Sequence, residues 1–155
     1  YTITFRNWDG TILEAKEWEY GTLPSYSGTP TRPADAEHTY TFSGWDKTVS
    51  SVTGEATYTA QYNGTTNSYT LTTSGEHGTT TGDGTYLYGK QVTITATADA
   101  CYEFVQWSDG DTRATREVTI TGNATYVATF RKVQYTITVQ SDNSAQGSVS
   151  ITAMP

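Results

Sequence analysis

The feature that most constrains this 155-residue chain is an internal duplication. The phrase YTITF opens the chain at residue 1, and YTLTT repeats it at residue 69. A second phrase, GEATY at 54–58, recurs at the same spacing as GNATY at 122–126. A third copy of the opening phrase, YTITV, stands at 135–139. Phrases that recur in the same order at one spacing indicate a tandem array of small units.

Each repeat is rich in residues that favour β-strands. Thr and Tyr are abundant, charged residues make up only 16%, and no window places apolar residues at helical spacing. In the opening phrase, Ile3 and Phe5 share a face with Tyr1 by strand alternation. The Pro-rich stretch after Gly21 does not fit a central strand, and PADAEH at 33–38 is the one candidate for a short helix. We therefore expect a mostly β fold, α+β at most.

The repeat spacing predicts the organisation of the chain. We expect a first module at 1–63, a linker at 64–68, a second module at 69–131 and the start of a third, incomplete repeat at 132–155. Units of about 65 residues are near the lower limit for independent folding, so the large aromatic side chains are expected to fill the cores. Short linkers leave little slack and predict an extended, semi-rigid array.

The interiors of the two repeats differ. The motif Tyr-x-Phe-x-x-Trp occurs at 40–45 and again at 102–107, which is a shorter spacing than that of the other phrases. The two repeats are therefore related but distinct types. For the third copy, we expect the YTITV strand to pair with the second module or with a strand edge of another molecule, because an unpaired edge invites strand addition.

Several motifs together resemble the Listeria–Bacteroides repeat, also called the internalin B-repeat. In the first unit they are Asp9-Gly10, PTR at 30–32, YTFSGW at 40–45 and the closing aromatic strand at 58–62. The second unit, with YGKQVTITATADACYEFVQWSDGDT at 88–112, resembles a divergent relative, although Gln106 stands where a Gly usually precedes the Trp. The resemblance implies tandem β-grasp-like modules of a bacterial cell-surface or secreted protein, without catalytic residues.

Candidate chemistry is sparse. His38 and His77 lie in different repeats without paired spacing, so no metal site is expected. The two carboxylates of SDGDT at 108–112 favour a hairpin turn over a calcium loop, which supplies six to eight oxygens. Cys101 stands at the edge of an aromatic strand and is expected to be a buried small hydrophobe rather than a reactive thiol. We therefore expect no enzyme activity, no metal and no cofactor.

Charge and hydropathy narrow the range of expected binding partners. The formal net charge of −7 argues against nucleic acid, whose phosphates require clustered Lys and Arg. No apolar stretch is long enough to span a membrane. The expected partners are flanking repeats of the same chain, with a host surface protein or glycan as the alternative.

Two tryptophans decide between these alternatives. If Trp8 and Trp18 are exposed, they can anchor a sugar ring or a protein partner. If they pack across the hairpin or between modules, no such anchor exists. The leading interpretation is a stalk or spacer that presents a distal domain, and the alternative is an adhesive module that binds through Trp8 and Trp18.

Overall fold

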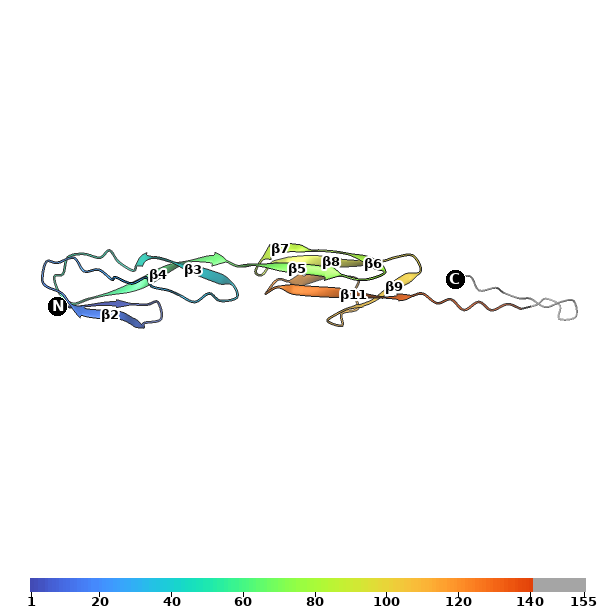
Figure 1. The fold of residues 1–155 in the computed structure, drawn as a ribbon, viewed down its shortest axis with the longest axis horizontal. Coiled ribbons are helices and arrows are strands. Elements are labelled where there is room, and N and C mark those ends of the chain that lie inside the picture. The colour runs from blue at the N-terminus through green and yellow to red at the C-terminus, as the bar shows by residue number, and fades with distance from the viewer. Residues whose placement is uncertain (141–155) are drawn as a thin grey trace, which may run out of the picture.

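The computed structural model describes residues 1–140, and it places two β modules end to end in an elongated molecule (Figure 1). This confirms the expected mostly β fold with tandem modules in an extended array. Within residues 1–140 there is no helix, and so none that could cross a bilayer.

The short helix expected at 33–38 is wrong, because this stretch is irregular and a strand begins at His38. The Asp35 carboxylate accepts the backbone N–H groups of Glu37 and His38, which forms a turn. The carbonyls of Asp35 and Ala36, which a helix would use internally, bond to the side chains of Asn67 and Tyr69 instead.

The first module is built on one four-stranded sheet with the order β2-β1-β4-β3. Its two central strands, β1 and β4, are parallel, and the edge strands β2 and β3 pair antiparallel to them. The strand bounds are β1 Thr2–Arg6, β2 Ile12–Glu17, β3 His38–Trp45 and β4 Ala56–Thr66. Gly10, with a φ of 88°, closes the β1–β2 turn at the expected Asp-Gly step.

The second module repeats this sheet and adds another. Its four-stranded sheet has the order β7-β5-β11-β9, with β5 and β11 parallel in the centre, and a three-stranded sheet has the order β10-β8-β6. The bounds are β5 Ser68–Ser74, β6 Gly78–Thr81, β7 Gly84–Leu87, β8 Gln91–Ala98, β9 Tyr102–Trp107, β10 Thr115–Thr119 and β11 Ala124–Lys132.

The duplication in the sequence is also a duplication in space. The backbone bond from Gly21 N to the Val52 carbonyl recurs between Gly89 and Ile120, the residues at the repeat spacing. A bulge interrupts β3 between Phe42 and Gly44, and the β9–β11 ladder has a matching irregularity beside Phe130. Equivalent residues therefore occupy equivalent places in the two modules.

The first core lies on one face of the sheet. Ile3 and Phe5 of β1 are fully buried, and the Phe5 ring stacks on Tyr58 of β4 at 5.3 Å. Tyr26 and Val52 cover this face from the irregular segments that follow β2 and β3. In a β-grasp unit a helix would cover this face of the sheet, and in this module irregular segments cover it instead.

The second core lies between the two sheets. Trp107 is fully buried and donates its indole N–H to the Arg113 carbonyl at 2.9 Å. Leu71 on β5 and Ile94 on β8 pack with it from the two sheets. The strands β6, β8 and β10 thus replace the irregular cover of the first module, which explains why the two repeats differ in their interiors.

The modules are joined with almost no linker. β4 continues to Thr66 and β5 begins at Ser68, so the expected linker at 64–68 is strand except for Asn67. Residues 133–140 form no strand, so the expected pairing of YTITV with the second module is not present in the part of the chain that the structure describes. Its pairing with a strand edge of another molecule stays a prediction. The rest of the third repeat, 141–155, lies outside the described residues.

Candidate functional site

The joint between the modules is held by hydrogen bonds from both sides. Asn67 is the one residue between β4 and β5, and both modules bond to its backbone. Its N–H donates to the Glu37 carbonyl at 2.8 Å, and its carbonyl accepts the N–H of Tyr88 at 2.9 Å. The backbone of Asn67 is therefore held from the first module and from the second.

The side chain of Asn67 adds three further bonds. Its amide nitrogen donates to the carbonyls of Asp35 at 2.8 Å and Ala36 at 3.2 Å. Its amide oxygen accepts the Thr39 hydroxyl at 2.7 Å. An Asn side chain offers two donors and an acceptor, so this residue type can satisfy all three groups at once.

Tyr69 completes the joint from the second module. Its hydroxyl donates to the Ala36 carbonyl at 2.6 Å. Tyr69 is the opening residue of the second repeat, so the same residue that marks the repeat in the sequence also contacts the repeat before it.

Asp35 shapes the loop that receives Asn67 and Tyr69. Its carboxylate accepts the His38 N–H at 2.7 Å and the Tyr40 hydroxyl at 2.8 Å. These bonds lower the pKa of Asp35 and raise the pKa of Tyr40. The loop therefore stabilises the charged carboxylate, which is the form of Asp35 present at neutral pH.

The joint has a mechanical consequence. Strands of both modules run almost continuously through Asn67. Asn67 is bonded to the first module's Asp35–Thr39 segment and to the Tyr88 N–H of the second module, and the Tyr69 hydroxyl bonds directly to the Ala36 carbonyl. A change of angle between the modules would break this direct bond and strain the bonds to Asn67. Sequence reasoning treated this stretch as a linker, and no motif in it identified Asn67.

Trp8 is the more exposed of the two tryptophans proposed as ligand contacts. It lies in the turn after β1 and is 46% exposed. The Arg32 guanidinium stacks over its ring at 4.5 Å and over the Tyr40 ring at 3.6 Å. A groove runs beside this stack and is lined by residues 29–32, Tyr40, Thr41, Phe42 and Tyr62.

Trp18 has a different environment. It follows β2, packs against the first core and is only partly exposed. Its indole nitrogen is buried without a hydrogen-bond partner in the described residues, and the Lys16 ammonium lies 5.0 Å from its ring. No ring contact joins Trp8 and Trp18 within residues 1–140, and neither takes part in the joint. The structure therefore separates the two residues rather than bringing them into one site.

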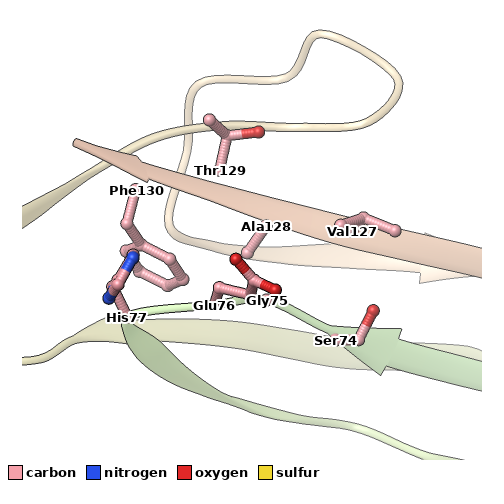
Figure 2. A pocket seen from close by; sticks show the side chains of 8 residues that line it. All are labelled: Ser74, Gly75, Glu76, His77, Val127, Ala128, Thr129 and Phe130. Carbon is pink, nitrogen blue, oxygen red and sulfur yellow. The ribbon is translucent and has the colours of Figure 1, made fainter.

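The second module has a hollow beside β11 (Figure 2). Phe130 and His77 lie at one end of it, and Ser74 and Val127 lie at the other (Figure 2). The His77 ring stacks on Tyr102 at 4.2 Å. Glu76 is the one carboxylate of the lining, so this hollow holds no paired acid and base.

The carboxylates of the SDGDT turn, which were compared above with a calcium loop, bind arginine side chains. Arg116 is almost fully buried, and it bonds to Asp109 and, at 2.9 Å, to Asp111. Arg113 bonds to Asp111 at 2.6 Å. The bond from Arg116 lowers the pKa of Asp109, and the bond from Arg113 lowers that of Asp111. The stretch is a tight turn, but it connects β9 and β10 of different sheets and is not the expected hairpin.

The expectation that Cys101 is buried is wrong, because its side chain is exposed. It has a φ of 66° in the turn before β9, and this left-handed backbone turns it out of the strand pattern that begins at Tyr102. His38 lies near the Tyr40 ring, far along the chain from His77. Within residues 1–140, no three His, Cys, Asp or Glu side chains gather as metal ligands would.

Together, these features define a class of protein: a tandem array of small β modules with a hydrogen-bonded joint. Residues 69–134 match the family model of the divergent InlB B-repeat domain. This match confirms the expected B-repeat relationship for the second module, and it ends one residue before the third copy of the opening phrase at Tyr135.

Two solved structures are similar in part. One is described as Streptococcal High Identity Repeats in Tandem (SHIRT) domains 3-4 from a cell surface protein. It is 17% identical with a TM-score of 0.39, and the match covers 86% of this chain and 98% of that one. The other is described as Mub-RV, with 12% identity, a TM-score of 0.19 and the same two coverages. No curated protein matches the chain.

Proposed function

We propose that this chain is a non-enzymatic spacer in the stalk of a bacterial cell-surface or secreted protein, where it holds a distal domain away from the envelope. The observation that carries the proposal is the joint at Asn67, which bonds both modules through one residue and leaves no free linker. The B-repeat match of the second module supports a repeat of bacterial surface proteins.

A rigid joint matters for a spacer because it sets the reach of the chain. The path from Ala56 to Ser74 runs through β4, Asn67 and β5, and at roughly 3.3 Å per residue it extends about 60 Å. A flexible Gly/Ser chain as long as the whole protein has a root-mean-square length of only about 70 Å. This one strand path therefore holds, at a fixed length, a reach close to the average reach of such a tether.

The test places the chain between a cell-wall anchor and an N-terminal epitope on bacteria that carry a surface polysaccharide. A Gly/Ser linker with the same number of residues replaces it in the comparison strain. We expect faster antibody binding to the epitope on the folded spacer, and an intermediate rate with Asn67→Val, which loosens the joint. Equal rates for the folded spacer and the linker would contradict the proposal.

An adhesive module is the second candidate, and the exposure of Trp8 favours it. Trp8 is exposed and stacks with the Arg32 guanidinium, and Arg32 lines an open groove together with Pro30, Tyr40, Phe42 and Tyr62. Exposed aromatic and Arg side chains are the usual anchors of a binding surface. Trp18, which packs against the core, is the less suitable anchor of the pair.

Tryptophan fluorescence tests the adhesive function against a panel of glycans and extracellular-matrix proteins. Binding through this surface predicts a saturable change in emission that Trp8→Ala abolishes while the fold survives. Tyr20→Ala, which removes another exposed aromatic side chain of the first module, is the matched control and should bind normally. A response that Trp8→Ala leaves unchanged would exclude this surface.

A further inference from the structure

We propose that the far end of the second module is the docking surface for the third repeat, and that Tyr135 docks there by donating its hydroxyl to the carbonyl of Ala100. The surface consists of residues 99–101 and Val133. This inference rests on the proposed spacer function and extends its joint to the next repeat.

The first observation is a shared backbone bond. At the occupied joint, the N–H of Asn67 donates to the carbonyl of Glu37. At the far end of the second module, the N–H of Val133 donates to the carbonyl of Cys101, also at 2.8 Å. In each case the bond continues the ladder of the closing strand by one step. Val133 is therefore the counterpart of Asn67, and Cys101 is the counterpart of Glu37.

The second observation is the position of the tyrosine. Tyr69 follows Asn67 after one intervening residue, and Tyr135 follows Val133 in the same way. Tyr69 donates to Ala36, the residue before Glu37. The corresponding acceptor for Tyr135 is Ala100, the residue before Cys101.

The register shows why the repeat spacing differs at the second joint. The β3–β4 ladder continues past Tyr40↔Gly64 to His38↔Thr66, whereas the β9–β11 ladder ends at Tyr102↔Lys132, the equivalent of Tyr40↔Gly64. The closing strand of the second module is shorter by an even number of residues. Because side chains alternate with a period of two, the shortening keeps Tyr135 on the same face as Tyr69.

The third observation is that the tyrosine is docked at the first joint but not at the far end of the second module. Tyr69 is partly buried at the joint that the structure describes, whereas Tyr135 is 80% exposed. Ile137 and Val139 are also exposed, although their counterparts at the start of the first module, Ile3 and Phe5, are fully buried. Within residues 1–140, no hydrogen-bond donor reaches the carbonyl of Ala100. In this part of the chain, the Ala100 carbonyl and the Tyr135 hydroxyl are therefore both free to form the bond that Ala36 and Tyr69 form at the first joint.

The two joints should differ in strength. Val133 cannot make the three side-chain bonds of Asn67, so the second joint depends on its backbone bond and on Tyr135. Removal of one hydroxyl should therefore loosen the second joint more than the equivalent change loosens the first.

The test uses a chain in which residues 1–134 are followed by a second copy of 69–134, so that a complete repeat begins with Tyr at position 135. Cys101→Ser, made in both copies of the second module, removes the native thiols. Spin labels at Thr93→Cys and at the copy of Thr93 report the second joint, and labels at Thr41→Cys and Thr93→Cys report the first. Pulsed electron paramagnetic resonance gives the distance distribution across each joint.

We expect a single preferred distance across the second joint. Tyr135→Phe should raise the open population by about 2- to 10-fold, as the loss of one hydrogen bond predicts. Tyr126→Phe, which removes a tyrosine hydroxyl elsewhere in the second module, should leave the distribution unchanged. Circular dichroism of each variant verifies that the modules remain folded.

A broad distribution across the second joint, or one that Tyr135→Phe does not change, would overturn the docking proposal. If the first joint remains narrow in that case, the spacer function stands without it. If the first joint is broad as well, both proposals fail.

Discussion

Replacement of Asn67 by Val tests how much one side chain contributes to the joint. Val removes the bonds to Asp35, Ala36 and Thr39 and keeps the backbone bonds and a strand-compatible shape. Each hydrogen bond contributes about 0.5–1.5 kcal/mol net. The three share one side chain and lie near the surface, where water can replace them, so their contributions are not additive.

We therefore expect the closed joint to lose about 1–3 kcal/mol, which raises its open population by about 5- to 150-fold. Neither core contains Asn67, so the free energies of unfolding of the two modules should not change. The measurement is the distance distribution between labels at Thr41→Cys and Thr93→Cys in a Cys101→Ser background. Thr65→Val, an exposed substitution on β4, is the matched control.

The result that refutes this reasoning is an unchanged distribution in Asn67→Val. It would mean that packing or the backbone bonds alone hold the joint. A change of equal size in Thr65→Val would also refute it, because the effect would then belong to the strand and not to the amide.

Two further predictions concern the second module. Gly78→Ala should destabilise it by about 1–3 kcal/mol, because a Cβ there would overlap the Phe130 ring and lie 2.6 Å from the Thr97 carbonyl oxygen. Gly122→Ala, with open space around it, is the control, and urea unfolding followed by NMR measures both. The two aspartates bonded to Arg116 have lowered pKa values, so their stabilisation is present above the ordinary carboxyl pKa and is lost as the pH falls towards the lowered values. The urea concentration at the unfolding midpoint should therefore decrease as the pH is lowered from about 6 to about 2. An equally steep decrease in Arg116→Gln would contradict the assignment of this effect to the two aspartates.

Local patterns in the sequence were sufficient to predict the modules. The duplicated phrases mark strands that occupy equivalent places. Alternation placed Ile3 and Phe5 on one face, and both are buried, whereas Tyr1, predicted on the same face, is exposed at the start of the chain. The Tyr-x-Phe-x-x-Trp motif also identified Trp107, which fills the second core. These features depend on residues close together in the chain, so a single sequence carries them.

The joint depends on contacts that no local pattern contains. Asn67 bonds to residues around Asp35 that lie in a stretch expected to be helical, and this long-range use of their carbonyls is what excludes the helix. Cys101 was misplaced because its left-handed backbone breaks the alternation on which its expected burial depended. Trp8 and Trp18 looked equivalent by composition, and only the packing of the first core distinguishes them.

The central claim is that the two modules form one rigid rod. Residual dipolar couplings of backbone amides in both modules, measured in one alignment medium, test it most directly. We expect a single alignment tensor to fit the couplings of both modules, with the orientation that the Asn67 joint imposes. Separate tensors of different magnitude for residues 2–66 and 68–132 would show independent motion and would contradict the rod.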